Sequence, residues 1–385
     1  MTTLNSQNFT DFKAELTVES PGRINLIGEH TDYNDGFVLP AAINKKITFL
    51  FRRNQEKSTC NIYSANYDVG FQVHLDDINR SDIEWENYIL GVICELSKFS
   101  NKIEGFDCII KSDLPIGAGV SSSAALECGL AYGLNALFDL QLDKELLIKI
   151  SRDAEHNFVG TKCGIMDQFA VMMGKSKHVI LLDCKTLDHS EIPVDFHPYK
   201  ILLLNTNVSH NLASSEYNTR RRECEEGIRY IQIKYPEVQS LREVNLNMLE
   251  ESKQNMTALI YQRCEYVIQE NNRVLEAVEK TKENDLTGLG QLMYKSHRGL
   301  QHDYDVSCPE LDFLVDFSED KPYVLGSRMM GGGFGGCTIN LIHQDHVEAY
   351  VEEVSKAYKY KFNIDLTPIV VLPCHGTALK RDLKK

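Results

Sequence analysis

The chain has 385 residues, 43% hydrophobic and 25% charged, which is ordinary for a globular protein and long enough for two domains. Its formal net charge of −14 disfavours nucleic acid and anionic membranes as partners. Residues 1–7 lack the basic and apolar regions of a signal peptide, and no apolar run approaches membrane-spanning length. The eleven cysteines are odd in number and contain no CxxC pair, so we expect reduced thiols, a cytoplasmic protein and no zinc site.

Residues 21–36 form the first segment of unusual composition. The run places Arg23, Glu29, His30 and two aspartates between glycines, around a short apolar core. Burying so many polar groups together is costly unless each has a partner. A small polyhydroxyl ligand supplies such partners, because each hydroxyl both donates and accepts. The segment therefore predicts a sugar pocket that contains a catalytic cation, rather than a structural turn.

Strand-like and helix-like segments alternate irregularly along the chain. Runs rich in aliphatic and β-branched residues predict strands at 47–51, 108–110, 179–182, 201–204, 337–342 and 369–372. Leucines at helical spacing predict a helix over 126–137, and Asp143 is a candidate N-cap for a helix that reaches residue 154. Residues 219–282 are mostly helical in pattern. This order favours a mixed α+β fold, and Pro193 and Pro198 indicate a domain boundary between residues 190 and 200.

A glycine- and serine-rich loop follows the strand predicted at residues 106–111. Residues 112–125 read SDLPIGAGVSSSAA and open an apolar helix. A helix N-terminus after a glycine turn favours phosphate, because free N–H groups and the helix dipole both attract an anion. The loop matches neither a Walker A nor a Rossmann fingerprint. The alternative is a capped helix after a tight turn, but three serines add hydroxyl donors and a ligand for Mg²⁺.

Two carboxylates follow this helix. Asp167 lies among apolar neighbours after a glycine turn, where a nearby cation would keep it ionised, and it is a candidate general base for a hydroxyl. Glu155 suits Mg²⁺, which takes one or two carboxylates in addition to substrate phosphates. The alternative makes Asp167 a helix N-cap and Glu155 a solvated charge.

A second glycine-rich segment covers residues 326–336 and precedes a strand. So many glycines indicate a backbone that passes close to another group, such as a nucleotide phosphate or the active site of the other domain. The alternative is a flexible loop.

These segments together, in this order, resemble the GHMP family of small-molecule kinases. Residues 22–34 (GRINLIGEHTDYN) resemble the hallmark sequence of the galactokinase branch, and residues 212–217 (LASSEY) with the arginines at 220–222 are similar to that branch too. The resemblance extends from about residue 18 to 374, with Val120 where leucine is usual. It implies a two-domain GHMP kinase fold of the α+β class. An N-terminal mixed-sheet domain would cover residues 1–195, a C-terminal ferredoxin-like domain residues 196–385, and the active site would lie between them.

The resemblance also implies roles for particular residues. Asp167 would be the base for the C1 hydroxyl of D-galactose, and Arg23 would stabilise the charge that develops in transfer. The residues expected to bind the sugar are Glu29, His30, Thr31, Asp32, Gly164 and Tyr217. The residues expected to hold ATP are Gly117, Ala118, Gly119, Val120, Ser121, Ser122 and Ser123, with Trp85 beside the adenine. Ser123 and Glu155 would ligate Mg²⁺.

Several alternatives stay open at this point. A kinase for N-acetylgalactosamine would differ only in the substituent that its site accepts at C2 of the sugar. Mevalonate or homoserine would not need the hydroxyl partners at residues 29–32. A sensor that binds sugar and ATP without turnover is disfavoured by the intact Asp167, Arg23 and serine loop. Trp85 could equally be a core aromatic. We expect a monomer.

Overall fold

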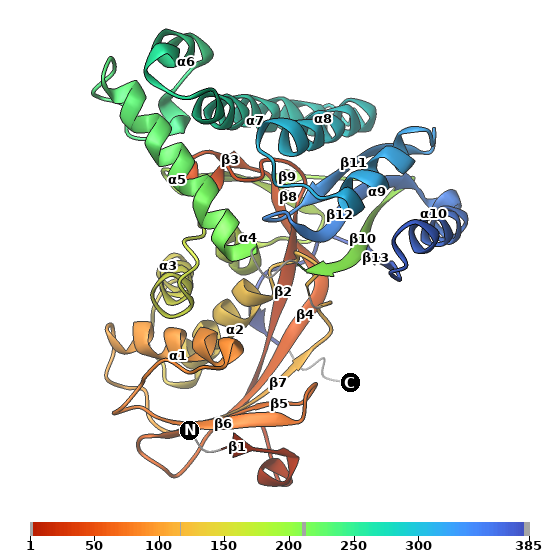
Figure 1. The fold of residues 1–385 in the computed structure, drawn as a ribbon. Helices are drawn as coiled ribbons and strands as arrows, with labels where there is room; N and C mark the ends of the chain where they lie inside the picture. Colours follow the sequence, from red (N-terminus) through yellow and green to blue (C-terminus); the bar gives the residue numbers. More distant parts are fainter. Residues whose placement is uncertain (1–2, 116, 210–212, 381–385) are drawn as a thin grey trace.

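The computed structural model describes residues 3–115, 117–209 and 213–380, and its elements form two sheet-based parts (Figure 1). The predicted segment at residues 212–217 begins with Leu212, which lies outside the described residues, as does Ile116 in the serine loop. None of the described helices is long and apolar enough to cross a membrane.

The first part is built on a seven-stranded sheet. In their order across it, the strands are β1 (Thr3–Leu4), β6 (Val69–His74), β5 (Thr59–Ser64), β7 (Phe106–Ser112), β4 (Pro40–Arg53), β2 (Leu16–Asn25) and β14 (Ala378–Leu379). Strands β5 and β7 are parallel and the other neighbours are antiparallel, so the predicted mixed sheet is confirmed. Because β14 pairs with β2, the end of the chain returns to the N-terminal sheet. The boundary between residues 195 and 196 stays a prediction.

Helices pack on one side of this sheet (Figure 1). They are α1 (Glu84–Ser97), α2 (Ser122–Leu137), α3 (Lys144–Ala154) and α4 (Met166–Met173). Helix α2 lies directly on β4, because a Cβ at Gly129 would stand 2.1 Å from the Phe49 ring. The side chain of Asp143 accepts from the Leu146 N–H and caps α3, as predicted. A three-stranded sheet of β3 (Phe37–Val38), β8 (His178–Asp183) and β9 (His189–Pro193) extends this part toward the second.

The second part contains an antiparallel sheet in the order β11 (Val324–Met330), β12 (Gly335–His343), β10 (Tyr199–Ser209) and β13 (Thr367–Val371). The helices between β10 and β11 are α5 (Ala213–Gln232), α6 (Leu246–Ser252), α7 (Ala258–Lys282), α8 (Leu286–Arg298) and α9 (Pro309–Glu319), and α10 (Val347–Phe362) connects β12 to β13. This is a βαββαβ order with the first and third strands at the centre, the ferredoxin-like arrangement that the family resemblance implies.

Short helical turns complete the described chain. They cover Ser6–Phe9, Asp32–Asn34, Glu155–Val159, Leu241–Glu243, Lys253–Asn255, Gly299–Asp303 and Gln344–His346. All six strand segments predicted from the sequence lie in strands, although residue 372 falls one position beyond the end of β13. The region 219–282 is helical, as predicted, but consists of separate helices α5, α6 and α7.

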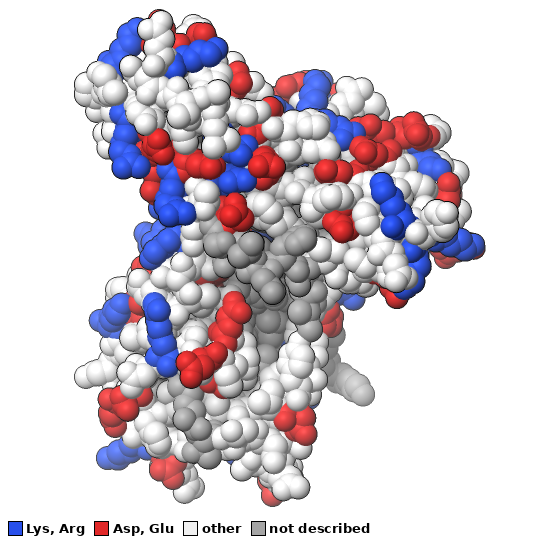
Figure 2. Space-filling view, viewed as in Figure 1, with Lys and Arg blue, Asp and Glu red and all other residues white. Residues whose placement is uncertain are grey.

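Charged side chains are spread over the face of the molecule that Figure 2 shows. Among the described residues of the face in Figure 2, acidic and basic side chains are interspersed rather than gathered by sign. The net charge of −14 is therefore not concentrated in one patch of this face.

Candidate active site

A bidentate ion pair joins Arg23 on β2 to Asp167 in the first turn of α4. The Nε and Nη2 atoms of Arg23 donate to the two carboxylate oxygens of Asp167 at 2.7 and 2.8 Å. The Arg23 side chain is 5% exposed and that of Asp167 28%, so the carboxylate is the more accessible partner. Helix α4 starts at Met166 with Ile165 as its N-cap, so Asp167 is not the helix cap. The predicted cation beside Asp167 is thus Arg23.

Burial alone would lower the pKa of Arg23, but the carboxylates of Asp167, Glu29 and Asp32 raise the pKa above its ordinary value. The guanidinium is charged at every relevant pH. Its Nη1 atom also donates to the Gly119 carbonyl in the serine loop. Arg23 therefore holds the candidate base and the serine loop in one arrangement.

Segments far apart in the sequence line one small cavity beside this pair. Its lining residues are Arg23, Glu29, His30, Asp32, Cys163, Met166, Asp167, Tyr217, Gly331 and Gly332. The segment at residues 21–36, the residues around Asp167 and the glycine-rich segment at residues 326–336 therefore meet at one place. Residues 326–330 are part of strand β11, and only the residues after them form the loop that reaches this cavity.

Glu29 is held by a residue that the sequence did not single out. Arg328, on β11, donates from Nη2 to the Glu29 Oε1 atom at 3.0 Å, and the Gly331 N–H donates to the same oxygen at 3.0 Å. Arg328 also donates to the carbonyls of Leu26 and Asn25 on the N-terminal side. Its only signal in the sequence is that it is a lone arginine in an apolar, glycine-rich run.

Asp32 and Gly164 form a tight contact. A Cβ at Gly164 would stand 2.0 Å from the Oδ2 atom of Asp32, so no larger residue fits there without moving the carboxylate. Burial, together with the negative charges of Asp167 and Glu29, raises the pKa of Asp32 to about 7. The predicted role of Gly164 is therefore best understood as making room for Asp32.

His30 lies in a cluster of aromatic rings. Its ring centroid is 5.0 Å from that of Tyr304, 5.3 Å from that of Tyr217 and 5.7 Å from that of Tyr33. Burial, with a further contribution from the positive charge of Arg220, lowers the pKa of His30 to about 3. The ring is therefore neutral at physiological pH.

Thr31 differs from its predicted neighbours. Its hydroxyl is directed at the carbonyl oxygens of Gly28 at 2.9 Å and Phe37 at 2.7 Å, and the residue is fully buried. It does not line the cavity. Thr31 therefore shapes the loop that carries Glu29, His30 and Asp32, and its contact with the sugar stays a prediction.

The side chains of the serine loop lie in different surroundings. Ser121 has a left-handed backbone with φ of 56° at the start of α2, and its hydroxyl donates to the Asp167 Oδ2 atom at 2.5 Å. Ala118 and Val120 have buried side chains, so only their backbone can face a ligand. Ser122 and Ser123 line a second cavity. The hydroxyl of Ser121 is directed at the candidate base, and the contact of this residue with ATP stays a prediction.

This second cavity has a volume of about 590 Å³ and includes Trp85, Tyr88 and Leu126 beside Ser122 and Ser123. Its surface is mainly apolar. Trp85 lines it and also packs edge-on against Phe71, with ring centroids 5.3 Å apart. Both interpretations of Trp85, as a core aromatic and as a wall of the nucleotide site, are therefore compatible with its position.

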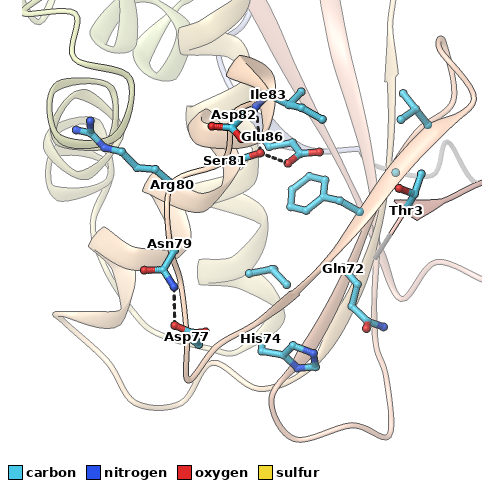
Figure 3. A pocket seen from close by; sticks show the side chains of 14 residues that line it. Thr3, Gln72, His74, Asp77, Asn79, Arg80, Ser81, Asp82, Ile83 and Glu86 are labelled. Carbon is cyan, nitrogen blue, oxygen red and sulfur yellow. Dashed lines mark hydrogen bonds between the residues drawn. The ribbon is translucent and has the colours of Figure 1, made fainter. Parts of the chain in front are cut away.

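A third cavity, of about 790 Å³, is lined by Phe71 and other residues of β6 and by the segment before α1 (Figure 3). Polar side chains such as His74, Asp77 and Arg80 surround it, and Ser81 donates to Glu86 at 2.6 Å. It contains none of the predicted site residues, so it is separate from the candidate site despite its size.

Glu155 belongs to a buried acidic cluster. The Nε2 atom of Gln168 donates to Glu155 Oε2 at 3.1 Å and to Glu127 Oε2 at 3.3 Å. Burial and the charge of Asp167 raise the pKa of Glu155 to about 7, and burial with the charge of Glu155 raises the pKa of Glu127 well above its ordinary value. One oxygen each of Glu127 and Gln168 is buried without a hydrogen-bond partner.

Carboxylate oxygens are ligands that Mg²⁺ prefers, and a positive charge beside Glu155 and Glu127 would relieve the burial of the acids. Among the described residues, no group of three or more His, Cys, Asp or Glu side chains is placed to hold a metal ion, so a cation here would need further ligands from the nucleotide. Ser123 and Glu127 are four residues apart on α2 and so share a helix face. Glu127 and Gln168 were not predicted. Their signal is a polar residue at an otherwise apolar helix position, which is ambiguous in a single sequence.

Comparison with known proteins agrees with this geometry. The galactokinase galactose-binding signature matches residues 7–53, the GHMP kinases N terminal domain matches residues 87–175, and the GHMP kinases C terminal matches residues 275–359. The chain is 42% identical to a galactokinase of Thermotoga neapolitana over 353 residues, 91% of this chain and 96% of that protein. It is 40% identical to a galactokinase of Chloroflexus aurantiacus, over 93% of this chain and 92% of that protein.

Solved structures give the same result for the fold. The galactokinase of Lactococcus lactis complexed with galactose aligns with a TM-score of 0.92 and 34% identity, covering 97% of this chain and 98% of that one. The mevalonate kinase of Methanococcus jannaschii aligns with a TM-score of 0.67 and 18% identity, covering 95% of this chain and 100% of that one, and shares the fold alone. The chain therefore belongs to the galactokinases of the GHMP kinase family.

Proposed function

We propose that this chain transfers the γ-phosphate of ATP to the C1 hydroxyl of D-galactose, giving galactose 1-phosphate and ADP. Membership of the GHMP kinase family implies ATP as the co-substrate. The observation that carries the proposal is the bidentate Arg23–Asp167 pair on a cavity that Glu29, His30 and Asp32 also line. A polyhydroxyl ligand matches this mixture of acceptors and donors.

Asp167 is proposed as the base. Its carboxylate would orient the C1 hydroxyl and accept its proton during transfer. Phosphoryl transfer passes through a loose transition state, so little activation of the nucleophile is needed and a carboxylate already paired with a guanidinium suffices. Arg23 and the Ser121 hydroxyl keep that carboxylate in one orientation, which is the main requirement of a positioning mechanism.

Charge neutralisation is the second requirement. The guanidinium of Arg23 donates to both the base and the Gly119 carbonyl. It would stabilise the negative charge that develops near the C1 oxygen of galactose, which receives the phosphoryl group. The N-terminal end of α2, after Gly117 and Gly119, offers backbone N–H groups to the phosphates of ATP. Trp85 and the apolar cavity beside Ser122 would take the adenine.

Ser123 and Glu155 are proposed to hold Mg²⁺, with Gln168 orienting the Glu155 carboxylate. The ion, when bound with the nucleotide, would supply positive charge next to the β- and γ-phosphates. Burial and the charge of Asp167 raise the pKa of Glu155 to about 7, so a nearby cation would favour its ionised form.

Release of ADP tests the proposal. The protein is mixed with ATP and Mg²⁺ and with galactose, N-acetylgalactosamine, glucose or mevalonate in separate reactions. We expect turnover with galactose well above the other three. Equal turnover with N-acetylgalactosamine would favour the alternative amino-sugar kinase. No ADP above background with galactose, alongside saturable binding of sugar and nucleotide, would favour a sensor.

A further inference from the structure

A chain of hydrogen bonds ends on the ring of His30. The Cys224 Sγ atom lies 3.1 Å from the Tyr304 hydroxyl, which lies 2.8 Å from the Tyr33 hydroxyl, which lies 2.8 Å from the Nδ1 atom of His30. Cys224 and Tyr304 come from the C-terminal part, and Tyr33 and His30 from the N-terminal loop. The two parts of the molecule therefore meet in one polar chain behind the sugar cavity.

The other ring nitrogen of His30 has no such partner. Its Nε2 atom is buried without a hydrogen bond, and His30 lines the cavity beside Asp167. The backbone is fixed as well, because the Asn34 Nδ2 atom donates to the His30 carbonyl at 2.9 Å. Against the larger effect of burial, the Gly332 backbone also acts on the ring to raise its pKa. One ring nitrogen is thus committed to Tyr33, and Nε2, which makes no hydrogen bond of normal geometry with the described residues, is the one available to a ligand.

A neutral imidazole carries a single proton, so the partner of Nδ1 decides what Nε2 offers. The low pKa of His30 makes the ring neutral, and the pKa of Cys224, raised to about 11 mainly by burial, keeps the thiol protonated. Each hydroxyl also has one proton. The chain can therefore run from the thiol toward the imidazole or from the imidazole toward the sulfur. A third arrangement, in which the imidazole and Tyr304 both donate to Tyr33, leaves the Tyr33 proton without an acceptor in this chain.

Acidity selects between these directions. A phenol is a stronger acid than a neutral imidazole N–H, and an imidazole nitrogen is a stronger base than a phenol oxygen, so O–H to N is the stronger bond. The thiol then donates to Tyr304, Tyr304 donates to Tyr33, and Tyr33 donates to Nδ1. The reverse direction would end on sulfur, which is a weak acceptor.

We propose that Tyr33, supported by Tyr304, is a positioning residue that fixes His30 as the tautomer protonated on Nε2, so that the ring donates to a sugar hydroxyl oxygen. The sugar contact rests on the proposed function, whereas the tautomer does not. The ring nitrogen is then a hydrogen-bond donor of fixed direction, beside the Glu29 carboxylate, which accepts, and the Asp32 carboxyl, which accepts when it is ionised. A hydroxyl placed between such groups can donate to one and accept from another.

The tautomer is measured by long-range ¹H–¹⁵N correlation spectra of histidine-labelled protein without sugar, with His30 assigned from a His30→Gln variant. We expect the Nε2–H form in the unmodified protein. Removing one hydroxyl in Tyr33→Phe leaves Nδ1 without its donor, so we expect mixed tautomers. Tyr358→Phe is the matched control, because it removes a buried hydroxyl on α10 that donates at 2.9 Å to the Thr206 carbonyl and does not line the cavity of His30.

Kinetics and titration give the second readout. We expect KM for galactose to rise about tenfold in Tyr33→Phe with kcat little changed, the size of one lost neutral hydrogen bond, and a smaller rise in Tyr304→Phe. Adding galactose should shift the Nε2–H signal of His30. Tyr358→Phe should match the unmodified protein in both measurements.

Three outcomes would overturn the proposal. One is an Nδ1–H tautomer in the unmodified protein, which decides the question even if Tyr33→Phe does not fold. The second is an unchanged tautomer and KM in Tyr33→Phe. The third is a galactose-bound protein whose His30 signal does not move. If galactose is not a substrate at all, the proposed function fails, while the sugar-free spectrum still decides the tautomer.

Discussion

The Nη2 atom of Arg328 lies 3.0 Å from the Oε1 atom of Glu29, and both side chains are at most 3% exposed. The two residues are 299 positions apart in the chain. Arg328 also donates to the carbonyls of Leu26 and Asn25. A single buried guanidinium from β11 therefore fixes the loop that carries the residues proposed to bind the sugar. The second glycine-rich segment therefore contributes to the site through a side chain as well as through its backbone.

Replacing Arg328 with methionine should destabilise the protein strongly. It would leave the Glu29 carboxylate buried without its cation, and breaking a buried pair from one side typically costs about 3–5 kcal/mol. Urea unfolding of the variant measures the loss. The control is Arg298→Met, which breaks partly exposed pairs with Asp316 and Glu319 and should cost less than about 1 kcal/mol. Equal losses in the two variants would contradict a special role for Arg328.

Asp167→Ala should remove nearly all turnover and leave a folded protein. Loss of a general base typically lowers kcat by about 10²–10⁴-fold. ADP release at saturating galactose and ATP measures kcat, and circular dichroism checks the fold. Asp153→Ala, which removes a carboxylate from a half-exposed pair with Arg152, is the control and should keep full activity. A soluble Asp167→Ala with near-normal kcat would exclude the role of base.

Gly164→Ala should weaken galactose binding through Asp32. The new Cβ would stand 2.0 Å from the Asp32 Oδ2 atom, so the carboxylate must move. We expect KM for galactose to rise about tenfold or more, the loss of a hydrogen bond to a charged group. A double-mutant cycle with Asp32→Ala tests whether the effect of Gly164→Ala on KM acts through Asp32. Gly164→Ala should add little in the Asp32→Ala background, whereas additive effects would show that it acts elsewhere.

Asp32→Asn should stabilise the protein at pH 8 and have less effect at lower pH. In the folded protein without ligand, burial and the charges of Asp167 and Glu29 raise the pKa of Asp32 to about 7 from its ordinary value of 3.8. The folded state therefore binds the proton more tightly. The stability that Asp32 contributes is full below the unfolded pKa and is lost as pH rises through about 7.

The amide removes this loss, so the difference in urea midpoint between Asp32→Asn and the unmodified protein should grow between about pH 4 and pH 7 and level off above pH 7. Asp153→Asn, at a half-exposed site, is the control for the same substitution at the surface. A difference that is constant from pH 4 to pH 8 would mean that the pKa of Asp32 is not raised on folding. We also expect Asp32→Asn to lose galactose affinity, so stability and binding would change in opposite directions.

Trp85 should report nucleotide binding, because it is the one tryptophan in the chain and lines the cavity beside Ser122 and Ser123. We expect a saturable change in intrinsic fluorescence with ADP and little change with galactose alone. Trp85→Leu should raise KM for ATP and leave KM for galactose unchanged. A fluorescence change with galactose but not with ADP would place the adenine elsewhere.

Much of the candidate site could be predicted because its signals are local. Arg23, Glu29, His30 and Asp32 lie within ten residues, and the predicted strands and helices follow from short-range periodicity. The sequence says least about side-chain direction where neighbours in the chain point in different directions. Thr31 is turned toward backbone carbonyls although the residues on each side of it line the cavity, and Ser121 is directed at Asp167 although Ser122 and Ser123 line the second cavity. Their contacts with sugar and ATP stay predictions.

By itself, the sequence determined the fold class, the family, and the candidate base with the cation beside it, because these depend on motifs of adjacent residues. The tertiary structure alone decided which distant groups complete the site. Arg328, Gln168 and Tyr304 carry no local pattern that separates them from surface residues. Their importance arises only when packing buries them beside Glu29, Glu155 and Tyr33, where water can no longer satisfy a polar group and each must find its partner within the protein.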